Sequence, residues 1–216
     1  RGSKTEAVVV VASVSDGRHH TGRGECVPYA RYGESVEGVE AAIEACARPI
    51  ANGLSRAGLA ALLPAGAARN ALDCAFWDYE ARMAQRRVHE LAGLPPPRPL
   101  LTAFTISIGS PDTMAAAARA AADRPLLKIK LGGAGDPDRI TAVRAAVPKA
   151  ELIVDANEGW RADNLAENLA ACANAGVTLV EQPLPDGDDG ILREIDHPLA
   201  VCADESVHDR KSLSDL

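Results

Sequence analysis

The stretch that decides the fold is Leu126-Leu127-Lys128-Ile129-Lys130-Leu131, an apolar run with lysines at two alternate positions. A short apolar run of this kind predicts a buried β-strand. Side chains two residues apart on a strand point to the same face, so Lys128 and Lys130 share one face, with Cα atoms about 6.5 Å apart. This strand therefore predicts a sheet that carries positive charge near the carboxyl end of one strand.

Four other short apolar runs occur on both sides of this strand, separated by alanine-rich segments with helical periodicity. They are residues 102–108, 152–155, 178–181 and 200–203. Ser110-Pro111 and Asp136-Pro137 each place a capping side chain before a proline at the first helical position, which predicts two helix starts. The alternation of strands and helices predicts an α/β domain with a parallel sheet over residues 99–216.

Five βα units of about 25 residues each favour a (β/α)₈ barrel over a doubly wound sheet, because no glycine-rich phosphate loop follows the first strand. A complete barrel needs about three more units, and an open parallel sheet would leave unpaired edges. We therefore expect an incomplete barrel with about five of its eight strands. The chain is then a fragment, or a partly ordered portion, of a longer protein.

The residues before the barrel have a different character. Glu6 to Val14 and Thr21 to Val27 are strand-like and flank the turn Asp16-Gly17, which predicts a hairpin. One long helix is predicted from about Ala65 to Ala92, ended by Gly93 and the prolines at 95–97. Residues 1–98 are thus predicted to form a small α+β domain.

The overall composition narrows the class of function. The net charge is −7 and the 23 lysines and arginines are scattered, which argues against nucleic-acid binding and favours a small-molecule substrate. The apolar segment 7–12 is too short to cross a membrane and lacks the layout of a signal peptide. The five cysteines form no CxxC pair, as expected of reduced thiols. We expect a cytoplasmic protein without a membrane partner.

Charged residues close four consecutive strands of the predicted barrel. They are Lys130, Asp155, Glu181 and Asp204, and functional side chains of such barrels gather at this end. Three carboxylates brought together repel one another unless a cation neutralises them. Oxygen ligands favour a hard ion, so Asp155, Glu181 and Asp204 are predicted to bind one Mg²⁺ per active site.

Lys130 is interpreted as a general base, with Lys128 as its partner that lowers its pKa and orients the substrate. A lysine needs its pKa lowered by about 3 units to act near neutrality, at a cost of roughly 4 kcal/mol. A second ammonium, a nearby divalent cation and partial burial all act in that direction. A lysine base beside such a metal suits removal of a proton α to a carboxylate, because the metal stabilises the resulting enediolate.

These motifs resemble the enolase superfamily, in its muconate-lactonising subgroup, along the whole chain. The resemblance lies in Lys-Ile-Lys at 128–130, Val-Asp-Ala-Asn-Glu-Gly-Trp at 154–160, Val-Glu-Gln-Pro at 180–183 and Ala-Asp-Glu-Ser at 203–206. Within the subgroup, residues 1–7, 24–35 and 63–74 are similar to the bacterial L-Ala-D/L-Glu dipeptide epimerases. The resemblance implies an enolase-type barrel whose N-terminal domain caps it and helps to select the substrate.

The same resemblance implies an isomerase, and it assigns further roles. The reaction would be Mg²⁺-dependent epimerisation of L-Ala-D/L-Glu dipeptides by 1,1-proton transfer through an enediolate, in murein peptide recycling. Lys130 would act on the S face of the glutamate α-carbon, and Arg1 and Thr105 match positions that hold the dipeptide. A homo-oligomer is expected. A second base lysine and an acidic motif would follow Leu216, and a strand would precede Arg1.

Other interpretations remain open at the level of sequence. The same residues would serve N-acylamino acid racemisation, o-succinylbenzoate synthesis or muconate cycloisomerisation. A Schiff-base aldolase barrel could also end a strand with Lys130, although it would not need three carboxylates. An inactive fragment or a binding module is the alternative without catalysis. The loop Gly132-Gly133-Ala134-Gly135 is interpreted as an ordinary turn, not as a phosphate-binding loop.

Overall fold

The structure is a computed structural model that describes residues 5–214 and residue 216. The chain divides into two compact units, Arg1–Arg98 and Pro99–Leu216. No helix within the described residues is both long and apolar enough to span a membrane. All five cysteines lie in the described part of the chain and are free thiols.

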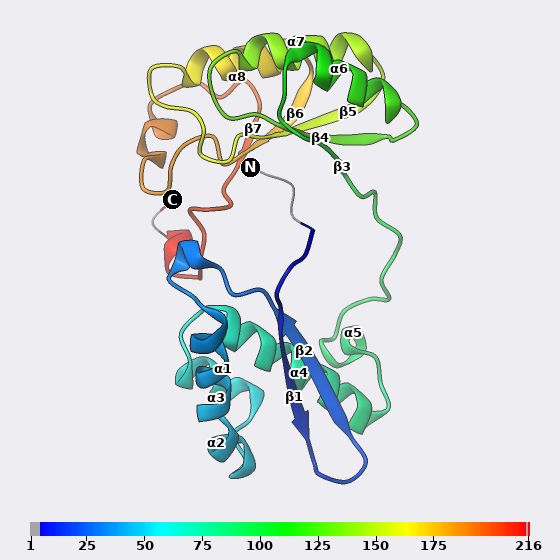
Figure 1. Ribbon diagram of the computed structural model, residues 1–216, viewed down its shortest axis with the longest axis vertical. Helices are drawn as coiled ribbons and strands as arrows, with labels where there is room; N and C mark the ends of the chain where they lie inside the picture. The colour runs from blue at the N-terminus through cyan, green and yellow to red at the C-terminus, as the bar shows by residue number, and fades with distance from the viewer. Residues whose placement is uncertain (1–4, 215) are drawn as a thin grey trace. The chain divides into compact units, whose positions relative to one another are not determined.

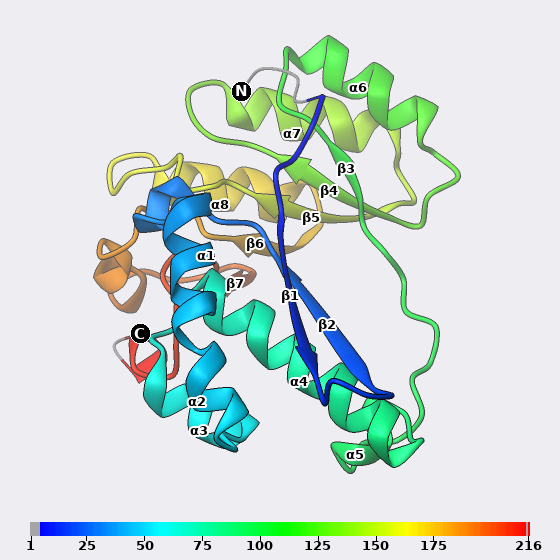
Figure 2. The same ribbon diagram turned by 60° about the horizontal axis from the view of Figure 1, so that its bottom comes forward.

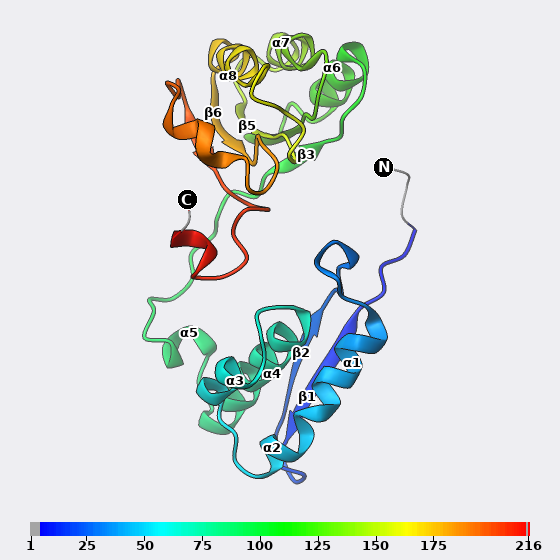
Figure 3. The same ribbon diagram turned by 90° about the vertical axis from the view of Figure 1, so that its left-hand side faces the viewer.

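The first unit is an antiparallel hairpin with helices packed along it. Strands β1 and β2 pair from Val10↔Cys26 to Ser15↔Thr21, helix α4 runs along them, and α1 lies beside β1 (Figure 3). The alternating inward residues of β1 pack with Ala71, Leu72 and Phe76 of α4 in a separate core. The elements are β1 (Val10–Ser15), β2 (Thr21–Cys26), the 3-10 turn η1 (Ala30–Tyr32), α1 (Val36–Ala45), α2 (Ala47–Ala51), α3 (Arg56–Leu62), α4 (Ala67–Ala84) and α5 (Val88–Leu91).

Two glycines allow α4 to approach the hairpin closely. A Cβ at Gly24 would lie only 2.0 Å from the carbonyl oxygen of Ala71, and one at Gly22 would lie 2.1 Å from that of Ala75. Both clashes are with the helix backbone, which cannot rotate away as a side chain can. Strand β2 and helix α4 therefore depend on glycine at these positions.

We expect Gly24→Ala to lower the free energy of unfolding by about 3 kcal/mol, because the added methyl group must displace the α4 backbone. Urea denaturation followed by circular dichroism measures this loss. Gly190→Ala is the matched control, since a Cβ there meets nothing within 4 Å; it should stay within about 0.5 kcal/mol of the parent. Equal stability of the two variants would contradict the close packing.

The prediction of one helix from Ala65 to Ala92 is wrong beyond Ala84. Helix α4 ends at Ala84, and α5 is a separate short helix. Gln85 adopts a left-handed conformation with φ 50°, and the amide of Arg86 donates to the carbonyl of Ala81 at 3.0 Å. This is a Schellman-type ending at a residue other than glycine, so composition gave no signal of the break.

The second unit is a five-stranded parallel sheet in the order β3-β4-β5-β6-β7, which confirms the predicted α/β class. Helices α6, α7 and α8 all lie on one side of the sheet (Figures 1 and 2). The elements are β3 (Phe104–Ile106), α6 (Pro111–Ala120), β4 (Leu126–Lys130), α7 (Asp136–Ala146), β5 (Glu151–Asp155), α8 (Leu165–Asn174), β6 (Val177–Glu181), η2 (Asp189–Arg193), β7 (Ala200–Cys202) and η3 (Ser212–Ser214). Strand β3 is shorter than the predicted 102–108, as an edge strand paired only with β4.

The two faces of this sheet have opposite chemistry. Leu127, Ile129 and Val154 are fully buried against the helices, in one core with Ile140 and Leu169. The alternate residues point to the other face, where Lys128, Lys130 and Glu181 are only half-buried. The period of two in these strands therefore places the charged residues opposite the helical layer.

The two predicted helix caps have different outcomes. The hydroxyl of Ser110 accepts a hydrogen bond from the amide of Thr113 at 3.2 Å, which confirms the start of α6. The Asp136 cap is wrong, because Gly135 is the N-cap residue and Asp136 already belongs to α7. Its carboxylate turns back to the amides of Gly132 and Gly133, which offer two donors at once.

Candidate functional site

Parallel pairing brings the predicted site residues of three strands to one level of the sheet. Lys130 is the register partner of Asp155, and Asp155 is the partner of Glu181. Partners in a parallel ladder point to the same face, so these side chains lie together on the face away from the helices. Thr105 is the register partner of Lys128 on β3 and is exposed on the same face.

The two lysines and two carboxylates form one ion-pair network. The ammonium of Lys128 lies 2.8 and 2.7 Å from the two carboxylate oxygens of Glu181 and 2.9 Å from Asp155 Oδ2. Lys130 Nζ lies 2.5 Å from the same Asp155 oxygen and 2.7 Å from Asn157 Oδ1. Asp155 is thus shared by both lysines.

The network fixes the charge state of two of its members. Burial alone would raise the pKa of Asp155, but hydrogen bonds and ion pairs with Lys130 and Lys128 outweigh it and lower that pKa below its usual value. Burial opposes the charge of Lys128 as well, yet its bonds to Glu181 and Asp155 raise the pKa of this lysine overall. Asp155 is therefore a carboxylate and Lys128 an ammonium at neutral pH.

Asp204, the third predicted ligand, is not part of this network. Its side chain is exposed, and no group of three or more acidic, histidine or cysteine side chains in the described residues is arranged to hold a metal ion. The donor set nevertheless has the right chemistry for a hard cation, because Asp155 and Glu181 present carboxyl oxygens on adjacent strands and Asp204 follows the next strand. These residues fit Mg²⁺ in kind and in strand order.

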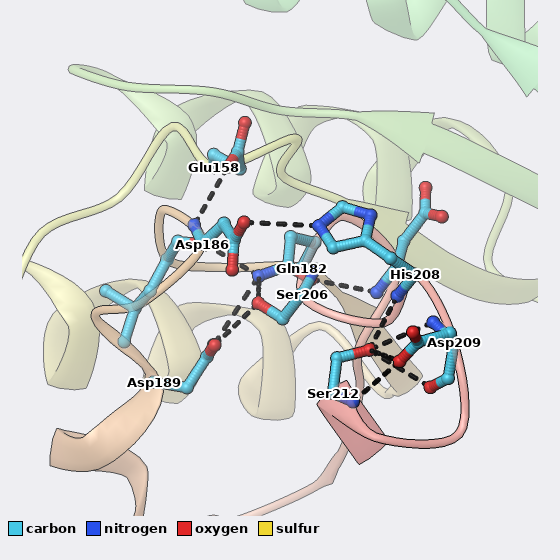
Figure 4. Close-up of polar contacts among 10 residues, drawn as sticks. Glu158, Gln182, Asp186, Asp189, Ser206, His208, Asp209 and Ser212 are labelled. Carbon is cyan, nitrogen blue, oxygen red and sulfur yellow. Dashed lines mark hydrogen bonds and ion pairs between the residues drawn. The ribbon is translucent and has the colours of Figure 1, made fainter. Parts of the chain in front are cut away.

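Gln182 links the ends of β6 and β7, as Figure 4 shows. Its side chain is fully buried and its Oε1 accepts from the amides of Asp204 at 2.8 Å and Ser206 at 3.1 Å. Its Nε2 donates to Ser206 Oγ and to the carbonyl of Leu184, both at 2.8 Å, while Ser206 Oγ donates to Asp189 at 2.5 Å. Gln182 therefore sets the backbone position of Asp204.

Two residues after Asp155, the chain takes an unusual path. Asn157 and Glu158 both have left-handed φ angles, 43° and 63°, which are uncommon outside glycine. The amide of Asn157 donates to Asp155 Oδ1 at 3.0 Å, and its side chain reaches Lys130. Neither Asn157 nor Gln182 was predicted as a site residue. The signals in the sequence were their places inside two of the quoted motifs, with Asn157 two residues after Asp155 and Gln182 directly after Glu181.

The glycine-rich loop after β4 is held by an internal anion. Asp136 Oδ2 accepts from the amides of Gly132 and Gly133 at 2.9 and 2.8 Å and from the indole of Trp160 at 2.8 Å. Asp136 Oδ1 accepts from Arg139 Nη1 at 2.8 Å. Because these amide donors are already used, the structure agrees with the interpretation of the loop as a turn.

Arg1 lies outside the described residues, so its predicted role in holding substrate stays a prediction.

A cavity of about 930 Å³ lies beside β7 and the loop that follows it, lined among others by Gln182, Val201 and His208. Its lining does not include the lysines of β4, so this cavity is separate from the ion-pair network.

Family models match both units of the chain. The mandelate racemase/muconate lactonizing enzyme N-terminal domain matches residues 1–93, and the enolase C-terminal domain-like model matches residues 113–216. The L-Ala-D/L-Glu epimerase of Escherichia coli is 48% identical over 218 residues, covering 100% of this chain and 68% of that protein. The N-acetyl-D-glutamate racemase of a Pseudoalteromonas species is 40% identical, covering 95% and 65%.

Solved structures show the same relationship. An enolase family member from Agrobacterium tumefaciens with homology to dipeptide epimerases, bound to sodium and L-Ala-L-Glu, has a TM-score of 0.93 and 53% identity, covering 100% of this chain and 66% of that one. A dipeptide epimerase from Enterococcus faecalis, complexed with Mg and L-Leu-L-Tyr, has a TM-score of 0.85 and 27% identity, covering 96% and 63%. The chain spans about two-thirds of the length of these relatives.

These matches confirm an enolase-type architecture with an N-terminal domain of the capping type and a partial barrel. The named relatives are epimerases and racemases, which are isomerases. With both family models matched and 48% identity to a relative across the whole chain, this protein belongs to the enolase superfamily, in its mandelate racemase/muconate-lactonizing branch.

Proposed function

We propose that this chain carries the metal site and one of the two bases of an epimerase acting on L-Ala-D/L-Glu dipeptides. The observation that carries the proposal is the single open sheet face on which Lys128 and Lys130 meet Asp155 and Glu181. The full-length identity to an L-Ala-D/L-Glu epimerase supports the choice of substrate. Murein peptide recycling, a cytoplasmic location and a homo-oligomeric state remain predictions.

In this proposal Asp155, Glu181 and Asp204 hold Mg²⁺. The bound cation would supply positive charge beside the substrate carboxylate, where negative charge develops as the α-proton leaves. Lys128 contributes a further permanent positive charge at the same place, since its neighbours keep it protonated. Oxygen ligation by carboxylates is the chemistry Mg²⁺ prefers in proteins.

Lys130 is proposed to remove the glutamate α-proton in this site. Its Nζ lies on the polar sheet face, held between Asp155 Oδ2 and Asn157 Oδ1. A base needs a fixed direction toward the proton it removes, and two acceptors on neighbouring positions provide it. Thr105 lies one strand away on the same face, which supports its proposed contact with the substrate beside the lysines.

The relative named N-acetyl-D-glutamate racemase supports a second candidate. An N-acylated glutamate shares with L-Ala-Glu both the acidic side chain and an amide nitrogen on the reacting carbon. The proton-removing residues would serve both substrates equally. The two candidates therefore differ only in what holds the acyl group.

The test uses the full-length protein with Mg²⁺ in D₂O and follows the glutamate α-proton by NMR. L-Ala-L-Glu should exchange its α-proton and epimerise, and N-acetyl-L-glutamate, assayed in parallel, should react with at least tenfold lower kcat/KM if the dipeptide is preferred. A reversed ratio would favour the racemase. Absence of exchange with either compound would overturn both assignments.

We expect Gln182→Leu to weaken Mg²⁺ binding about 10- to 100-fold, because a change of this size follows loss of groups that orient metal ligands. Leucine keeps the volume but cannot accept the amide of Asp204. Calorimetric titration with Mg²⁺ measures the effect without substrate. Asn174→Leu, at the exposed last residue of α8, is the comparison; equal Mg²⁺ affinities in the two variants would argue against this role for Gln182.

A further inference from the structure

Glu205, which follows the predicted ligand Asp204, has an arrangement that the proposed function does not use. Its Oε1 accepts a hydrogen bond from Asn157 Nδ2 at 3.2 Å. Its Oε2 is buried and has no hydrogen-bond partner among the described residues. Burying a carboxylate oxygen without a partner is costly, so the position of this side chain calls for a role.

Asn157 connects Glu205 to the proposed base. Its Oδ1 accepts from Lys130 Nζ at 2.7 Å while its Nδ2 donates to Glu205 Oε1. The left-handed φ of Asn157 shows that the backbone accepts an unfavourable conformation there, a feature that clusters at functional sites. One side-chain amide thus bridges the ends of three segments: β4, the loop after β5 and the loop after β7.

The direction of this amide decides whether Lys130 can act as a base. A neutral amine has two N–H donors and one lone pair. If the donors go to Asp155 Oδ2 and Asn157 Oδ1, the lone pair stays free; if the amide were rotated by half a turn, Nδ2–H would donate to the lone pair and mask it. In the first orientation Asn157 Nδ2 donates to Glu205 Oε1 at 3.2 Å, whereas the rotated amide would set its own oxygen against that same oxygen, so Glu205 favours the first orientation.

We propose that Glu205 is a positioning residue that locks the Asn157 amide so that the lone pair of Lys130 is directed at the substrate. The inference rests on the proposed role of Lys130 as base. In this proposal Glu205 makes no contact with the substrate and acts through Asn157 alone. We expect a defect confined to the face of the α-carbon that Lys130 serves.

The first test is Glu205→Gln in the full-length protein, because the new amide can donate as well as accept and so no longer dictates the orientation. Exchange of the α-proton of L-Ala-L-Glu in D₂O should lose about 10- to 100-fold in kcat, with KM nearly unchanged. Exchange that starts from L-Ala-D-Glu, where the opposite base removes the proton, should fall much less. Equal losses for both epimers, or a Mg²⁺ affinity reduced more than tenfold, would overturn the proposal.

The second test is a double-mutant cycle. Asn157→Leu removes the amide that Glu205 is proposed to orient, so adding Glu205→Gln to Asn157→Leu should change kcat less than about twofold. A further tenfold loss in the double variant would overturn the lock, because Glu205 would then act by a route other than Asn157.

A readout without substrate separates this inference from the proposed function. The side-chain amide resonance of Asn157, assigned with Asn157→Asp, should shift in a ¹H–¹⁵N spectrum of Glu205→Gln and stay in place in Glu167→Gln, a control on α8. A shift in a protein that exchanges neither epimer would refute the dipeptide activity and support only the contact between Asn157 and Glu205. An unmoved Asn157 resonance would refute the lock whatever the activity.

Discussion

Lys130→Ala is expected to reduce exchange of the glutamate α-proton of L-Ala-L-Glu by about 10²- to 10⁴-fold, the range for loss of a general base. Epimerisation should fall in both directions, because each direction needs Lys130 either to remove or to return a proton. The measurement is NMR of the full-length enzyme with Mg²⁺ in D₂O. Activity within a few fold of the parent would mean that Lys130 is only a surface charge at a strand end.

The control for this substitution is Lys149→Ala, an exposed lysine in the turn before β5, which should leave the rate unchanged. Circular dichroism should show that Lys130→Ala is folded, since the side chain is 28% exposed and Lys128 still neutralises Asp155. Borohydride in the presence of substrate distinguishes the aldolase alternative. Covalent trapping on Lys130 would replace proton removal with Schiff-base chemistry.

The second unit was predictable because its strands are fully buried on one face. Leu127 and Ile129 alternate with lysines, and Val154 belongs to a short apolar run that ends at Asp155, so strand positions and strand-end residues could both be predicted. Parallel pairing then required Lys130, Asp155 and Glu181 to lie side by side. The ion-pair network follows from this register more than from any motif.

Other features depend on tertiary contacts that periodicity cannot show. Helix α4 ends at Gln85 through a backbone conformation that glutamine rarely adopts, and the sequence there resembles any helical segment. Gln182 and Asn157 are polar residues just after strands, a position where most side chains are solvated. Their roles arise from partners 22 to 48 residues away, at Asp204, Ser206, Lys130 and Glu205.

Asp136→Asn is expected to lower the free energy of unfolding by about 3–5 kcal/mol, as removal of one member of a buried ion pair does. Asp136 is 1% exposed and all of its bonds are to donors: two glycine amides, Trp160 Nε1 and Arg139. The asparagine amide has one accepting oxygen, so either orientation sets its NH₂ against another donor. Chemical denaturation monitored by tryptophan fluorescence measures the loss, because Trp160 is a direct partner.

Asp138→Asn provides the matched comparison, since it removes a carboxylate from the same first turn of α7 at an exposed position. It should cost less than about 1 kcal/mol through the helix dipole alone. A small, equal effect in both variants would mean that Asp136 acts only as a helix-terminal charge. A large effect confined to Asp136→Asn would show that the buried Asp136 carboxylate holds the loop after Lys130 through its glycine amides. A Cβ on Gly159, in the loop after β5, would lie 2.3 Å from the Cα atom of Gly132 in the loop after Lys130. The two loops are therefore in close contact, and loss of the Asp136 bonds should also disturb the loop that places Asn157 against Lys130.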